Sequence, residues 1–73
     1  MNIKLYSTHC GHCQTIALLL KKKNLSYEEI YVDPTKPEEV QIIANLGLNS
    51  APALVVDGKV MDYRTAFDWL RGQ

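Results

Sequence analysis

The sequence predicts a small α/β domain in which three helices flank a four-stranded mixed sheet, in the order β-α-β-α-β-β-α. Three observations predict this class. Strand-like runs at 2–6 and 27–32 enclose a stretch with helical apolar periodicity at 11–23, and an Asp-Gly pair at 57–58 separates two apolar runs. Because 73 residues support one hydrophobic core, residues 1–73 are expected to form a single domain.

The first three elements form a β-α-β unit. Residues 2–6 alternate polar and apolar side chains, which is typical of a strand, and residues 27–32 carry the aromatic and β-branched side chains of a second one. A helical crossover between them predicts that the two strands pair in parallel. The helix at 11–23 ends in three lysines, where positive charge complements the helix dipole, and its apolar stripe contains Cys13, Ile16, Ala17, Leu19 and Leu20.

A second helix is predicted after a break at 33–34. Its cap is either Thr35, with Glu38 completing a capping box, or Lys36, and a proline lies in its first turn. Gly47 is expected to end this helix. The stripe predicted to be buried contains Val40, Ile43, Ala44 and Leu46.

The last third of the chain predicts a hairpin and a third helix. Asp57-Gly58 between apolar runs is the strongest short hairpin signal. The run at 54–56 is apolar at every position, so helices are expected on both faces of this strand, which we place beside the first strand. The third helix is predicted to begin near Asp62 and to present Ala66, Phe67 and Leu70 inward.

Composition excludes several functional classes. Eight basic side chains balance eight acidic ones, without the basic excess typical of nucleic-acid binding. The longest apolar run, at 16–20, is far shorter than the roughly 20 residues that span a bilayer, so no membrane association is expected. The N-terminus lacks the pattern of a signal peptide. We therefore expect a cytoplasmic monomer.

The two cysteines, Cys10 and Cys13, are expected to perform chemistry. A bridge between them closes a loop too short to stabilise the fold appreciably. They lie where the first strand gives way to the first helix, and a helix N-terminus favours thiolate over thiol. We expect Cys10 to attack a disulfide and Cys13, one turn further in, to resolve the intermediate. A protonated His12 would place positive charge near the Cys10 sulfur.

Two other functions stay open at this point. His9, Cys10, His12 and Cys13 are all metal-ligand types, but structural zinc sites usually draw ligand pairs from two segments, and this chain has no second Cys or His segment. A zinc or iron–sulfur site would therefore be shared between two chains. The other alternative is a module that binds a partner without turnover. The redox hypothesis requires no metal and no bound cofactor.

The strand, the Cys-X-X-Cys at a helix start and the apolar strand after Ala51-Pro52 together resemble the glutaredoxin and thioredoxin superfamily over the whole chain. The Tyr6-Ser7 lead-in and the hairpin at 57–59 look most like small glutaredoxins and glutaredoxin-like redoxins. The Gly-His pair inside the motif resembles that of protein disulfide isomerases and predicts a reduction potential above that of thioredoxin. The resemblance implies a thioredoxin fold, a cis Pro52 facing the thiols, and an Ala51 backbone that pairs with an extended substrate.

The resemblance further implies a thiol-disulfide oxidoreductase with a redox-active disulfide, acting in electron transport and cell redox homeostasis. Its substrates would be protein disulfides or glutathione mixed disulfides. Either glutathione or a flavoenzyme of the thioredoxin-reductase type would restore the dithiol. Glutaredoxins commonly carry a basic residue shortly before the first cysteine, where this chain has Ser7-Thr8-His9. Asp62 lies where the family holds a glutathione carboxylate, and it also suits the N-cap of the third helix.

Overall fold

The computed structural model describes all 73 residues and contains the predicted sheet and helices. In chain order the elements are β1 (Ile3–Ser7), α1 (Gly11–Lys22), β2 (Glu28–Tyr31), α2 (Pro37–Asn45), β3 (Ala53–Val56), β4 (Lys59–Met61) and α3 (Tyr63–Arg71). The strand order is β2-β1-β3-β4; β1 and β2 are parallel and the other two pairs are antiparallel, so the third strand does lie beside the first. No helix here has the length and apolar character of a membrane span.

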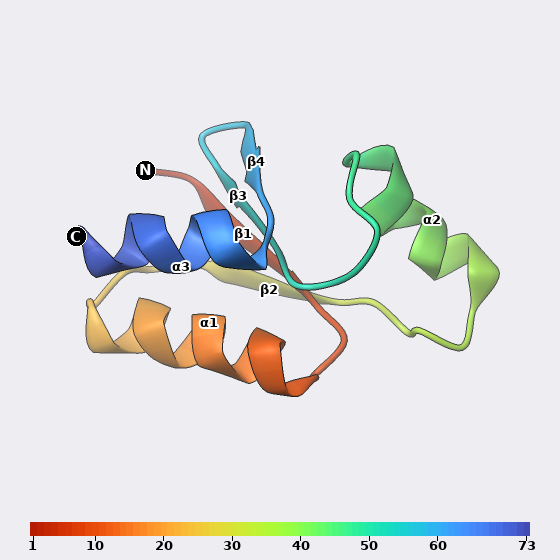
Figure 1. Cartoon of the computed structure of the whole chain (residues 1–73), viewed down its shortest axis with the longest axis horizontal. Coiled ribbons are helices and arrows are strands. Elements are labelled where there is room, and N and C mark those ends of the chain that lie inside the picture. Colours follow the sequence, from red (N-terminus) through yellow and green to blue (C-terminus); the bar gives the residue numbers. More distant parts are fainter.

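The main core lies between one face of the sheet and the pair α1 and α3, which run side by side (Figure 1). Alternation along β1 and β3 directs every second side chain to this face. Full burial of a leucine or isoleucine side chain contributes roughly 1.5–3 kcal/mol, so this layer holds the start of α1 against the sheet. The fully buried members of the cluster are Leu5, Ile16, Leu20, Leu54 and Leu70.

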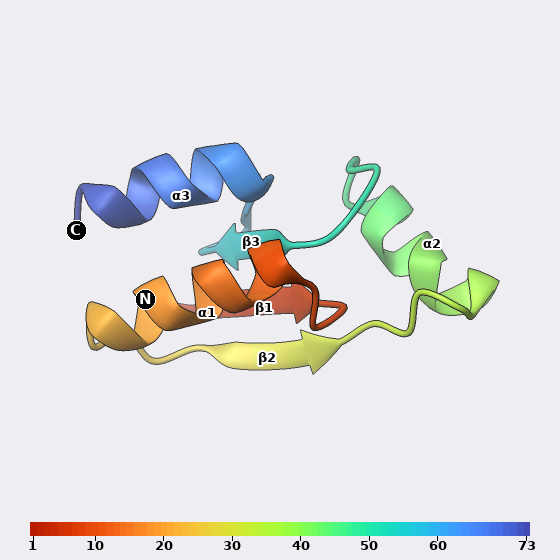
Figure 2. The same ribbon diagram turned by 60° about the horizontal axis from the view of Figure 1, so that its bottom comes forward.

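Helix α2 covers only one corner of the opposite face. Figures 1 and 2 show it beyond the end of the sheet where β1 and β2 finish, and a second buried cluster of Val32, Ile43 and Ala53 joins it to the sheet. The predicted buried stripe is therefore wrong for Val40 and Ala44, which are exposed. Val55, expected to be covered on this face, is only half-buried for the same reason.

The start of α2 decides between the two caps considered from the sequence, Thr35 and Lys36. The Thr35 N–H and hydroxyl both donate to Oδ1 of Asp33, at 2.9 and 2.7 Å, which closes a turn before the helix. Lys36 is the N-cap residue, without a capping side-chain hydrogen bond, and Pro37 is the first helical residue. The proline signal was correct, and Thr35 serves the preceding turn instead.

The β3–β4 hairpin forms at the predicted Asp57-Gly58 pair. Both residues have positive φ, 50° and 85°, as a type I′ turn requires. Asp57 also ties down the N-terminus, because its Oδ1 accepts the Asn2 N–H at 2.8 Å. Both chain termini lie at the end of the molecule opposite α2 (Figure 1). The end that carries the two cysteines is thus free of the termini.

Candidate active site at the start of the first helix

The two cysteines occupy the N-terminus of α1, to which β1 delivers the chain. The Ser7 hydroxyl oxygen accepts the His9 N–H at 3.0 Å, and His9 turns the chain with a φ of 62°. Cys10 then serves as the N-cap residue, and its Sγ accepts the Cys13 N–H at 3.3 Å. A sulfur at this position faces the unpaired N–H groups and the positive end of the helix, both of which stabilise a thiolate.

The two sulfur atoms lie 2.8 Å apart and differ in access to solvent. Cys10 is partly exposed, whereas Cys13 is only 1% exposed. Burial alone would raise the pKa of the Cys13 thiol, but hydrogen bonds with Cys10 and with the Thr8 amide lower it below its ordinary value of 9.0. Because the sulfurs share a hydrogen bond, the first proton lost belongs to the pair, and Cys10 is the sulfur that an outside disulfide can reach.

Thr8 belongs to this site, and the sequence analysis did not single it out. Its N–H donates to Cys13 Sγ at 3.4 Å, and its hydroxyl oxygen lies 3.7 Å from the same sulfur. These contacts stabilise negative charge on the Cys13 sulfur and so help the Cys13 thiol to lose its proton. The available signal was a hydroxyl residue in the loop just before the motif, but such residues are common in any loop.

His12 contacts α3, and no hydrogen bond or ion pair joins it to Cys10. Its ring stacks on Tyr63, with centroids 4.1 Å apart and planes at 13°. The expected influence of His12 on the Cys10 thiolate therefore stays a prediction. Tyr63 is a second residue that sequence reasoning missed, because only the fold brings α3 beside the motif.

His12 and the three residues predicted to bind substrate line one pocket of about 470 Å³. The Ala51–Pro52 peptide bond is cis, as the resemblance implies. Pro52 is buried, and Ala51 is half-buried. The pocket is mostly polar, with its remaining walls formed by Gly47, Leu48, Asn49, Ser50, Tyr63 and Arg64.

Asp62 is the N-cap of α3. Its Oδ1 accepts the Thr65 N–H at 2.8 Å, and this hydrogen bond holds the pKa of the Asp62 carboxyl below its ordinary value of 3.8. Asp62 also lines the pocket of His12, and its expected place near a glutathione carboxylate stays a prediction. Its capping role is observed directly.

We expect Asp62→Asn to lower the melting temperature near neutral pH by roughly a few degrees, because asparagine caps the helix without a negative charge at its positive end. The folded-state pKa of Asp62 is depressed, so its charge stabilises the fold above the unfolded-state pKa and ceases to do so as pH falls through the folded-state value. The difference between the two proteins should therefore vanish in acid. Thermal melts across pH measure it, with Asp68→Asn near the other end of α3 as the control; a difference that persists in acid would contradict this origin.

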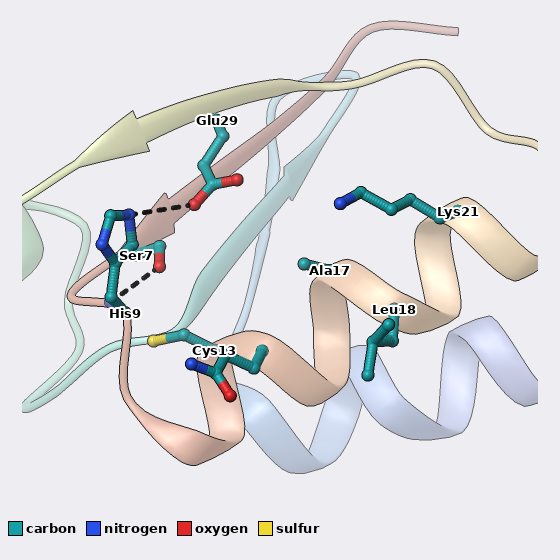
Figure 3. Close-up of a pocket in the computed structure, with 8 residues that line it drawn as sticks. Ser7, His9, Cys13, Ala17, Leu18, Lys21 and Glu29 are labelled. Carbon is teal, nitrogen blue, oxygen red and sulfur yellow. Dashed lines mark hydrogen bonds and ion pairs between the residues drawn. The ribbon is translucent and has the colours of Figure 1, made fainter.

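A second pocket, of about 360 Å³, reaches Cys13 from between α1 and β2 (Figure 3). His9 and Glu29 line it, and His9 Nε2 lies 3.4 Å from Glu29 Oε2. The His9 ring also tilts against Tyr31, with centroids 4.6 Å apart. Lys21 extends into the same space from α1 (Figure 3). The buried sulfur thus borders a polar opening separate from the face of Cys10.

The histidines beside the motif point to different partners. His9 pairs with Glu29 from β2, and His12 stacks on Tyr63 from α3. No three side chains of the His, Cys, Asp or Glu type converge in a geometry that could hold a metal ion. The four potential ligands grouped in the sequence, His9, Cys10, His12 and Cys13, are therefore not gathered into one metal site within this chain.

This chain is similar to known proteins in sequence and in fold. A family model described as glutaredoxin matches residues 3–61. The solved thioredoxin-like protein BC3987 is 25% identical and superimposes with a TM-score of 0.75, over 97% of this chain and 97% of that one. A search of curated proteins gives no match.

Two further solved structures share the fold at lower identity. A glutaredoxin from Archaeoglobus fulgidus is 24% identical, with a TM-score of 0.66 over 84% of this chain and 73% of its own. A glutathione transferase homologue from Sulfitobacter, solved with bound glutathione, is 20% identical, with a TM-score of 0.75 over 97% of this chain and 36% of its own. This chain therefore spans about a third of that transferase.

Proposed function

The chain belongs to the glutaredoxin family, and from this premise we propose that it is a dithiol–disulfide oxidoreductase acting through Cys10 and Cys13. The observation that carries the proposal is the pair of free sulfurs at the start of α1. They lie 2.8 Å apart, with Cys10 accessible and Cys13 buried behind it. Nucleophilic attack needs an accessible thiolate, and resolution needs a second sulfur within reach of the first.

The proposed reaction has two exchanges. The Cys10 thiolate attacks one sulfur of the substrate disulfide, a Cys10–substrate disulfide forms, and the other substrate sulfur leaves as a thiolate. The Cys13 thiol then loses its proton and attacks Cys10 Sγ, which expels the second substrate thiolate. The substrate gains two electrons and two protons in all, and the protein is left with a Cys10–Cys13 disulfide.

Substrate recognition is proposed to use the backbone of Ala51. Neither its N–H nor its carbonyl forms a hydrogen bond within the chain, and Ala51 lines a pocket together with Cys10. An extended substrate segment can therefore pair with this backbone while it presents its disulfide to Cys10. Unpaired backbone groups beside a nucleophile support a protein or peptide disulfide as the substrate.

Two reductants are proposed for the oxidised protein, glutathione and a flavoenzyme. Glutathione carries carboxylates, and the pocket of His12 contains the guanidinium of Arg64. A transferase homologue of the same fold was solved with bound glutathione, which supports this choice. A flavoenzyme of the thioredoxin-reductase type is the alternative, and both operate in a reducing cytoplasm.

The proposal is tested by coupled assays of disulfide reduction. One assay supplies glutathione, glutathione reductase and NADPH, and the other supplies thioredoxin reductase and NADPH. Turnover in at least one assay is the expected result, and the more active one identifies the reductant. If neither shows turnover while both cysteines titrate as free thiols, the oxidoreductase proposal is wrong.

Thr8→Val is expected to slow the second exchange by roughly 2- to 10-fold, because it removes a hydroxyl near Cys13 Sγ and keeps the backbone N–H. The Thr8 amide, which lowers the pKa of Cys13, is kept; the loss of a hydroxyl that can donate to Cys13 Sγ should disfavour the thiolate and move the pH profile of resolution to higher pH. Reactions quenched at set times across a range of pH measure how fast the mixed disulfide disappears. The control is Thr15→Val, whose hydroxyl donates to the Gly11 carbonyl; equal slowing in both variants would contradict the assignment.

A further inference from the structure

An apolar pocket of about 410 Å³ adjoins Cys10 and is distinct from the pocket of His12. The two pockets share only Asn49, Ser50 and Ala51. The backbone proposed to pair with substrate therefore runs between a polar pocket and an apolar one. The apolar walls come from the β2–α2 connection and from α2, namely Val32, Pro34, Val40 and Ile43.

Val40 is a wall residue whose side chain is exposed. It lies on the stripe of α2 that helical periodicity marks for burial, yet it is 41% exposed because α2 extends past the sheet. Ile43, one turn further along, is 3% exposed and anchors the helix. Val40 thus presents an unused apolar surface to a pocket that contains the nucleophile.

We propose that this pocket receives an apolar side chain located two residues from the reactive cysteine of a peptide or protein disulfide. The inference rests on the proposed function. Side chains of an extended strand alternate, so the residue two positions away faces the same side as the cysteine, roughly 6–7 Å along the chain. A cysteine bonded to Cys10 while its backbone pairs with Ala51 therefore directs that residue beside Cys10, where the apolar wall lies.

The occupant follows from the chemistry of the walls. The pocket has no charged side chain in its lining, and its polar members are Thr8, Asn49 and Ser50. Glutathione has no apolar side chain to fill such a space, whereas a leucine would bury much of its surface there. The apolar pocket therefore favours peptide disulfides over glutathione disulfides, and it makes Val40 a determinant of specificity.

The test uses the reduced protein in single-turnover reactions with symmetric disulfides of three short peptides. One peptide has only alanine around its cysteine, and the other two carry a leucine two residues before or two residues after it. We expect one of the leucine peptides to react about 5- to 10-fold faster than the alanine peptide. This ratio is smaller than complete burial of a leucine side chain would give, because the pocket is open to solvent. Val40→Asn should reduce this ratio to about one.

The control is Ile42→Asn, on the same helix at a similar exposure of 37% and outside the pocket, which should leave the ratio as in the unchanged protein. The ratio is taken within each protein, so a general loss of active molecules does not affect it. Equal rates for all three peptides, or a leucine preference that survives Val40→Asn, would overturn the pocket inference and leave the oxidoreductase proposal standing. Failure to reduce even the alanine peptide would overturn both.

Discussion

Replacing Cys10 with serine is expected to lower the rate of disulfide reduction by at least roughly 10³-fold, because a serine hydroxyl is not ionised at neutral pH and cannot form the mixed disulfide. The fold should be retained. Serine is among the preferred N-cap residues, so its hydroxyl can accept the Cys13 N–H that Cys10 Sγ accepts now. The reduction rate should therefore fall because the nucleophile is missing, not because the protein unfolds. Coupled assays measure the rate, and circular dichroism with thermal melting checks the fold.

The same variant separates an enzyme from a binding module. A module that holds its partner in the groove beside Pro52 without turnover would keep its affinity when Cys10 is changed to serine. An enzyme would keep only weak, noncovalent binding and would lose the covalent intermediate. Residual turnover within tenfold of the unchanged protein would contradict the role of Cys10 as the nucleophile.

Local sequence signals predicted most of the fold because they act over a few residues. The Asp57-Gly58 pair requires positive φ, and the structure has it. The stripe through Cys13, Ile16 and Leu20 faces the sheet as helical periodicity requires. The placement of both cysteines at the start of α1 follows from a strand ending directly before a helix. These features need no information about distant parts of the chain.

The errors in the predictions concern relations between distant segments. Periodicity identifies the apolar side of α2 but not how much of the sheet lies beneath it, so Val40 was predicted buried and is exposed. The stack of His12 on Tyr63 joins α1 to α3 and has no local signature. The cap of α2, left open between Thr35 and Lys36, is a local question: two hydrogen bonds from Thr35 to Asp33 hold Thr35 in the preceding turn, and Lys36 is the N-cap. Val40, predicted buried, and Tyr63, which the sequence analysis did not single out, line the pockets on which substrate recognition is proposed.

Replacing Cys13 with serine is expected to preserve the first exchange and prevent the second. Cys10 Sγ stays accessible at the helix start, so attack on a disulfide continues. The sulfur that lies 2.8 Å behind it is gone, and no other cysteine exists in the chain to replace it. The mixed disulfide should accumulate, and turnover of peptide disulfides without added thiol should fall by at least roughly 10²-fold.

Stoichiometry makes the Cys13→Ser result decisive. In a single turnover the unchanged protein releases both halves of a peptide disulfide as thiols, because Cys13 expels the half bound to Cys10. The Cys13→Ser variant should release one half and retain the other, visible as a mass increase of one peptide on the intact protein that a small thiol removes. Cys10→Ser is the matched control and should gain no mass. Release of both halves by the Cys13→Ser variant would show that another route resolves the intermediate, and the role assigned to the buried sulfur would then be wrong.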